Sequence, residues 1–129
     1  MRTILSQQEI PPWLREQLTR LDNLQQNLQA VVMQKQQVEA ELADADKTLE
    51  ELKTVSDTEQ IYKYVGSLLV KVSKEAIVKE LDEKKDISNT RTLVLNKQES
   101  RLKDSIKELQ NKIDSMLKGR TAGSQPGPS

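Results

Sequence analysis

The segment that constrains the fold most is residues 60–73, QIYKYVGSLLVKVS, which lies between two long polar segments with regularly spaced leucines. Its apolar residues are mostly β-branched or aromatic, and Gly66-Ser67 divides them into two short runs. A two-residue turn with glycine in the first place is typical of a β-hairpin. Because an isolated hairpin is marginally stable and leaves two strand edges unpaired, we expect other chains to complete it.

A long helix is predicted before the hairpin, over residues 12–55. Proline at residue 12 suits a first helical turn, and the sequence TVSDT at 54–58 favours a turn that ends the helix. Apolar residues recur every seven residues, which predicts a coiled-coil seam. The main row is Leu14, Leu21, Leu28, Lys35, Leu42 and Leu49, flanked first by Leu18, Gln25 and Val32 and then by Leu24, Val31, Val38, Ala45 and Leu52.

A second helix is predicted over residues 74–118, with Ser73 as its N-cap and Gly119 just beyond its end. Its seam is Ile77, Leu81, Ser88, Leu95, Leu102, Leu109 and Met116, joined by Ile106 and Ile113. The middle is polar at Lys84, Ser88 and Arg91. Two interpretations are open: these residues are charge-paired with Asp44, Asp46 and Glu50, or the helix frays at residues 88–90.

Together these elements predict a mainly α fold, a long antiparallel two-helix coiled coil joined by a single β-hairpin. The expected parts are an N-terminal segment at 1–11, a helix–hairpin–helix domain at 12–118 with the hairpin at 60–73, and a Gly/Ser/Pro-rich disordered tail at 119–129. The fold-back places Leu18 near Met116 and Leu49 near Lys84. Residues 9–59 carry eleven acidic and five basic residues, a net of −6, and residues 71–120 carry nine and thirteen, a net of +4, which favours this pairing.

Composition argues against catalysis, cofactors, metals, nucleic acid and membranes. The 129 residues include no His or Cys, and Lys plus Arg equals Asp plus Glu at 20 each. No stretch approaches the roughly 20 apolar residues of a membrane span, so a cytoplasmic protein is expected. The basic residues between Arg101 and Arg120 are interleaved with Asp104, Glu108 and Asp114 and are interpreted as a solvated face.

Apolar residues gather where the predicted helices begin and end. Ile10, Trp13, Leu14, Leu18 and Leu21 open one helix, and Leu109, Ile113, Met116 and Leu117 close the other. One interpretation is that these residues pack against one another and close the ends of the coiled coil. Ile10, Trp13 and Leu117, however, fall off the seam rows, and an apolar patch at a helix end is a candidate binding surface.

This helix, hairpin, helix order resembles a β-type subunit of the prefoldin family, with archaeal subunits and the eukaryotic sixth subunit most similar. The likeness covers about residues 8–118 and rests on the segment Ile61-Tyr62-Lys63-Tyr64-Val65-Gly66-Ser67-Leu68-Leu69-Val70-Lys71-Val72, on Lys74-Glu75 after it, and on Gln98, Glu99, Arg101 and Leu102. The α type resembles this with a longer connection and a second hairpin.

The resemblance implies an ATP-independent holdase that needs no cofactor. Two α-type and four β-type subunits would form a hexamer, capture unfolded client proteins at the coiled-coil tips and deliver them to a group II chaperonin. The implied platform residues are Ile61, Tyr62, Tyr64, Val65, Leu68, Leu69, Val70 and Val72. The implied client-binding residues are Ile10, Trp13, Leu14, Leu18, Leu109, Ile113, Met116 and Leu117. The alternatives are a coiled-coil scaffold or tether without chaperone activity, and a nucleic-acid accessory protein.

Overall fold

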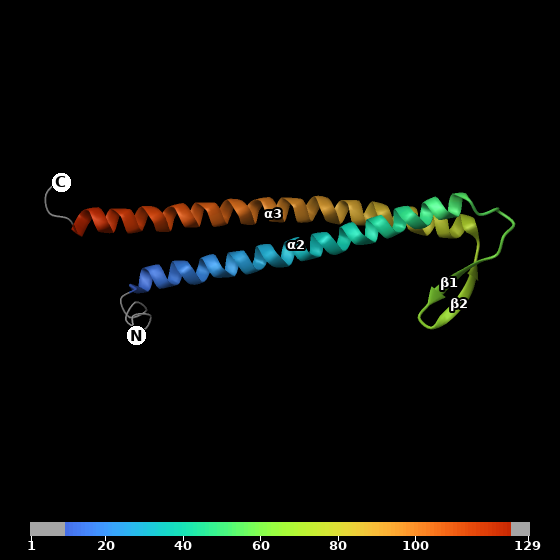
Figure 1. Ribbon diagram of the computed structural model, residues 1–129, viewed down its shortest axis with the longest axis horizontal. Coiled ribbons are helices and arrows are strands. Elements are labelled where there is room, and N and C mark those ends of the chain that lie inside the picture. The colour runs from blue at the N-terminus through green and yellow to red at the C-terminus, as the bar shows by residue number, and fades with distance from the viewer. Residues whose placement is uncertain (1–9, 125–129) are drawn as a thin grey trace. The chain divides into compact units, whose positions relative to one another are not determined.

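The computed structural model describes residues 10–124, and side chains as far as Gly119 (Figure 1). It contains helix α2 (Pro12–Lys53), strands β1 (Ile61–Val65) and β2 (Leu68–Val72), and helix α3 (Lys74–Ser124). The predicted fold class, two long helices joined by one antiparallel hairpin, is confirmed. The predictions for residues 1–9 and 125–129 lie outside the described residues.

Helix α2 begins at the predicted proline. The Pro11 carbonyl accepts hydrogen bonds from the backbone N–H groups of Leu14 and Arg15, at 3.1 and 3.0 Å, so the missing N–H of the proline ring leaves nothing unsatisfied. The helix ends at Lys53, where the Thr54 hydroxyl donates to the Glu51 carbonyl at 2.7 Å. This hydroxyl satisfies one of the free carbonyls of the last turn.

Helix α3 begins as predicted, because the Ser73 hydroxyl accepts a hydrogen bond from the Ala76 N–H at 3.1 Å. The predicted end at Lys118 is wrong, since the helix continues to Ser124. Gly119 does not adopt the positive φ of a helix-ending glycine, and glycine permits a stop without imposing one. Further along the sequence, Pro126 disfavours the helical conformation in the residue that precedes it.

The two strands pair antiparallel around Gly66-Ser67, in the register Ile61↔Val72, Lys63↔Val70 and Val65↔Leu68. Gly66 has φ 61°, and no described residue other than glycine has a positive φ. A positive φ at the first turn position alone is the signature of a type II′ turn, so the predicted turn chemistry is correct.

The chain forms two compact units. The first unit combines the described residues up to Val32 with those from Lys97 onward. The second unit is Met33–Asn96. Each has its own buried seam. In the first unit the buried side chains are Ile106, Leu109 and Ile113, and in the second they are Val38, Ala45, Leu52, Ser88 and Leu95.

The inner face of α2 differs from the prediction near its start. Leu18 and Gln25 are exposed, whereas Gln17 and Leu24 are half-buried. The inward stripe therefore combines two strict heptad rows, the predicted row from Leu14 to Leu49 and a flanking row from Gln17 through Leu24 and Val31 to Leu52, and the flanking row does not change sides. A strict seven-residue repeat keeps one stripe inward when paired helices supercoil slightly.

Candidate functional site

The hairpin exposes most of its apolar residues. Tyr64 is 73% and Leu68 is 67% exposed, and Tyr62, Val65, Leu69 and Val70 are also open to solvent. Only Ile61 and Val72, at the base, are half-buried. Within the described chain β1 and β2 form a two-stranded sheet, so both outer strand edges lack a partner there. An apolar hairpin with two free edges is a template for pairing with other strands.

Two lysines hold the hairpin and its preceding loop to the start of α3. Lys63 of β1 pairs with Glu80 of α3. The Lys74 ammonium donates to the Val55 carbonyl at 2.7 Å and lies 3.5 Å from the Asp57 carboxylate. These contacts fix the base of the hairpin while its turn end stays exposed. These contacts could not be predicted from the sequence, because ion pairs between irregularly spaced residues leave no periodic signal.

The polar midsection is helical and charge-paired in the second unit. Lys85 Nζ lies 2.6 Å from Asp46 Oδ1, and Arg91 Nη1 lies 3.8 Å from Glu41 Oε2. Helix α3 runs through residues 88–90 without a break. The structure thus favours the paired interpretation, but with Lys85 in place of Lys84 and with Glu41, which was not among the expected acids, as the partner of Arg91. Ser88 is buried.

Asp46 raises the pKa of its ion-pair partner, Lys85. The hydrogen bond from Lys85 to Asp46, together with the negative charge of that carboxylate, raises the pKa of Lys85 above its ordinary 10.5. The pair therefore persists at neutral pH and joins an acidic side chain of α2 to a basic one of α3, as the opposite net charges of the two segments suggest.

The predicted client-binding residues divide into three groups in the first unit. Leu109 and Ile113 are each 7% exposed and belong to its core. Ile10, Trp13 and Leu14 are half-buried. Leu18, Met116 and Leu117 are about 40% exposed.

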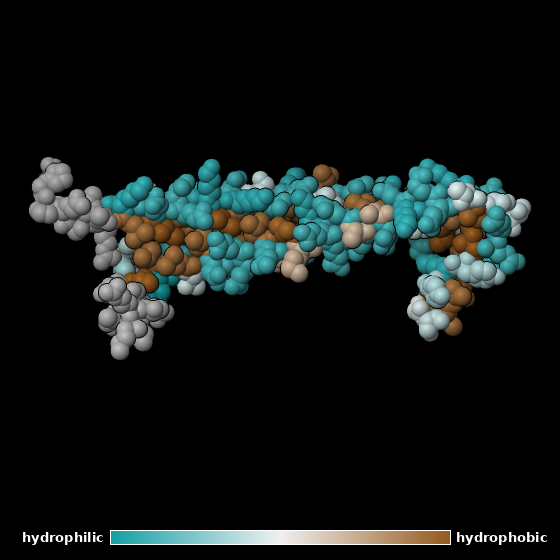
Figure 2. Space-filling model, viewed as in Figure 1, coloured by the Kyte–Doolittle hydropathy of each residue, from teal (hydrophilic) through white to brown (hydrophobic). Residues whose placement is uncertain are grey.

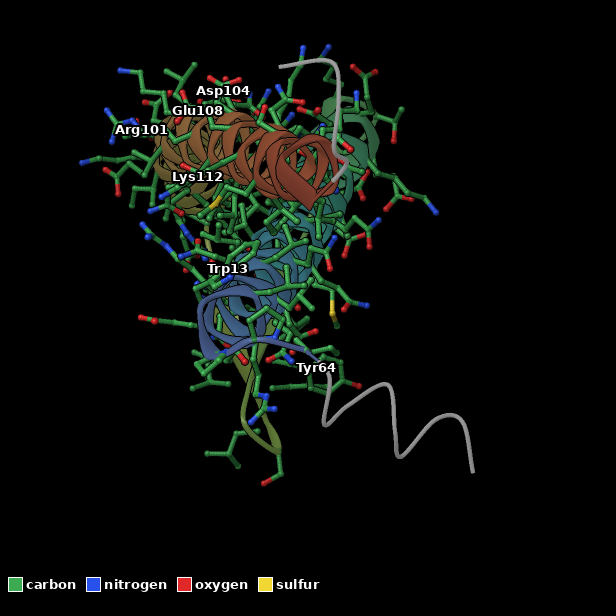
Figure 3. All side chains as sticks on the ribbon, turned by 90° about the vertical axis from the view of Figure 1, so that its left-hand side faces the viewer. Trp13, Tyr64, Arg101, Asp104, Glu108 and Lys112 are labelled. Atoms are coloured by element: carbon green, nitrogen blue, oxygen red, sulfur yellow. The ribbon has the colours of Figure 1, made fainter. Side chains whose placement is uncertain are left out.

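We call the six residues of the second and third groups the end patch: Ile10, Trp13, Leu14, Leu18, Met116 and Leu117. Figure 2 shows hydrophobic side chains gathered between the start of α2 and the end of α3. In Figure 3, Trp13 is labelled on the side of α2 toward α3. The end patch therefore continues the seam outward and leaves part of its apolar surface open.

Two features of the surface and seam were not foreseen. Gln17 lies in the seam of the first unit, and its Oε1 atom is buried with no hydrogen-bond partner among the described residues. Four large apolar residues off the seam are at least half exposed in the second unit: Met33, Ile87, Leu93 and Val94. The exposure of these four residues could have been predicted from the sequence, because they occupy heptad positions that point away from the seam.

Residues 10–124 contain no group of three or more carboxylates, histidines or cysteines that could hold a metal ion. In the same range no helix is long and apolar enough to cross a membrane.

The sequence matches the family model for prefoldin subunits over residues 15–120, which includes both helices and the hairpin. The chain belongs to the prefoldin family. It is 47% identical to prefoldin subunit beta of Pyrococcus horikoshii over 116 residues, covering 90% of this chain and 99% of that protein. It is 44% identical to prefoldin subunit beta of Pyrococcus abyssi, again over 116 residues that cover 90% of this chain and 99% of that protein.

A solved structure agrees. The crystal structure of the prefoldin beta subunit from Thermococcus strain KS-1 is 43% identical and superposes with a TM-score of 0.75, covering 85% of this chain and 96% of that one. The resemblance inferred from the hairpin is confirmed, and the chain is a β-type chaperone subunit of the prefoldin family, a family of non-enzymatic chaperones. The scaffold alternative gains no support from these relatives.

Proposed function

We propose that this prefoldin subunit captures unfolded polypeptides on its end patch, without nucleotide, and passes them to a group II chaperonin in the cytoplasm. The observation that carries the proposal is the exposure of Leu18, Met116 and Leu117 beside a buried seam. Apolar side chains that a coiled coil could have turned inward are instead offered to solvent, where apolar segments of an unfolded chain can cover them.

Several such patches acting together suit this task better than one strong site. Each end patch exposes only a few side chains, so one contact is weak and quickly released. An oligomer that presents several patches to one flexible chain gains avidity without any new contact. Transfer to the chaperonin then requires only competition for the same apolar segments.

Assembly through the hairpin would supply the several patches. We infer that Ile61, Tyr62, Tyr64, Val65, Leu68, Leu69, Val70 and Val72 form the subunit contacts, in a hexamer of two α-type and four β-type chains. The exposed apolar faces and free strand edges of the hairpin support this inference. The assembled chaperone would work without catalysis, metal or other cofactor, and without nucleic acid or membrane as a partner.

The test replaces Leu18, Met116 and Leu117 together with serine, which spares the buried seam. We expect the assembled variant to suppress aggregation of a chemically unfolded protein about tenfold less effectively, since the loss is repeated at every patch that shares one client. Light scattering during dilution from denaturant measures the effect.

The matched control replaces Met33, Ile87 and Leu93 with serine, because these side chains are at least as exposed but lie in the second unit. The control should behave like the unmodified protein. Equal loss in both variants would show that any exposed apolar residue holds clients, and unchanged activity of the end-patch variant would refute the assignment.

A further inference from the structure

A small cleft lies between the two helices of the first unit, next to the end patch. It has a volume of about 260 Å³ and is lined by Arg20 and Leu24 of α2 and by Ser105, Glu108, Leu109 and Lys112 of α3. Pockets for small molecules measure about 300–1,000 Å³, so this one has the size of one or two amino-acid side chains.

The cleft combines an apolar floor with a charged rim. Leu109 is buried and Leu24 is half-buried, whereas Arg20, Glu108 and Lys112 are exposed. None of these three charged side chains has an ion-pair or hydrogen-bond partner among the described residues. Two cations and one carboxylate leave the rim with one net positive charge. In Figure 3, Lys112 is labelled on the side of α3 toward α2, whereas Asp104 is on the side away from α2.

The cleft has a cation on each of its two walls, Arg20 on α2 and Lys112 on α3. Lys103 and Lys118 are exposed on the same helix but pair with Glu99 and Asp114, at 3.5 and 3.2 Å. Arg20 and Lys112 come from different helices, and both line the cleft. An anionic group placed there can interact with both of them over an apolar surface.

The cleft is continuous with the end patch. Lys112 precedes Met116 by four residues on α3, so the two side chains share one helix face, and on α2 Arg20 follows Trp13 of the end patch by seven residues, about two helical turns. One helical turn spans about 5.4 Å, which an extended polypeptide covers in about two residues. A client segment lying on the end patch can therefore place a neighbouring residue in the cleft.

We propose that this cleft is a second client subsite that selects an acidic residue next to apolar ones, with the carboxylate held by Arg20 and Lys112 and an apolar side chain on Leu24 and Leu109. The proposal rests on the proposed function, capture of unfolded chains at the end patch. A polypeptide fits better than a nucleic-acid strand, because none of the lining residues is aromatic and could stack on a base.

The test compares two fluorescent peptides, one with Asp and Glu beside apolar residues and one with Asn and Gln in the same places. At low ionic strength the assembled protein should bind the acidic peptide about two- to tenfold more tightly, a modest preference because exposed ion pairs are weak and screened by salt. The variant R20Q with K112Q should lose this preference and bind the amide peptide unchanged.

The matched control, R101Q with K107Q, removes the same two residue types from exposed positions of α3 outside the cleft. It should keep the preference. Equal binding of both peptides by the unmodified protein, or the same loss in both variants, would overturn the subsite and leave end-patch capture standing. Failure to bind either peptide would overturn both proposals.

Discussion

At the scale of single residues, the contact between Asp46 and Lys85 shows how the polar midsection is held. The ammonium is fixed 2.6 Å from the carboxylate by a bond between the two helices, not within one. A raised Lys85 pKa means that the folded state holds the lysine proton more tightly than the unfolded state. The pair therefore contributes stability below the ordinary pKa of lysine and loses it as pH rises through the raised pKa.

Replacing Asp46 with Asn should lower the melting temperature slightly at about pH 7, where Lys85 is charged, and the difference from the unmodified protein should close as the pH rises through the raised pKa of Lys85, which lies above 10.5. Thermal unfolding followed by circular dichroism measures both values. Asp44→Asn is the control, because the structure gives the Asp44 side chain no ion pair, and it should change neither. A gap that stays constant across this range would show that the pair does not stabilise the fold.

At the scale of elements, Gly66 and Gly119 have opposite roles. Gly66 holds a positive φ in the hairpin turn, whereas Gly119 lies in α3. A Cβ atom added at either position would meet no atom within 4 Å, so a substitution tests the backbone alone.

Gly66→Ala should destabilise the protein by about 1 kcal/mol, because left-handed backbone is unfavourable for an L-residue with a side chain. Gly119→Ala should be neutral or stabilise it by up to about 1 kcal/mol, because alanine is the better helix former. Urea unfolding at one protein concentration measures both. The same sign for the two changes would contradict the assigned turn or the extended α3.

The hairpin is also the element on which assembly should depend. Tyr64↔Leu69 is a cross-strand pair with both side chains exposed. Changing both residues to Asp should abolish the oligomer and leave helix content intact, because burial of two unpaired carboxylates in a subunit contact is unfavourable. Size-exclusion chromatography with light scattering gives the mass. Ile87→Asp with Leu93→Asp, equally exposed on α3, should assemble normally, and an intact oligomer of the hairpin variant would refute the contact.

At the scale of the whole molecule, the order of elements could be predicted from sequence because three signals agree. Heptad leucines, the Gly66-Ser67 turn and the Ser73 cap each specify one element, and the structure has all of them. The depth of each residue in the seam could not be predicted. Spacing identifies an apolar stripe but not how deeply each residue lies in it, so the buried Leu109 and Ile113 were grouped with the exposed Met116 and Leu117.

Electrostatic detail was less predictable than periodicity. The net charges of the two segments indicated that they would pair. Which lysine pairs, Lys85 or Lys84, depends on the rotation of α3 about its axis, and composition does not determine that rotation. The contacts of Lys63 with Glu80 and of Lys74 with the Val55 carbonyl depend on how the hairpin packs against α3. Such contacts are set by the fold and become visible only with it.

We propose that this chain acts as a β-type subunit of a prefoldin hexamer assembled through its hairpin. The most direct test is native mass spectrometry of the chain recovered, with a tag, from its own cells. We expect a hexamer with four copies of this chain and two of a longer α-type relative. A homodimer without any other subunit would contradict it.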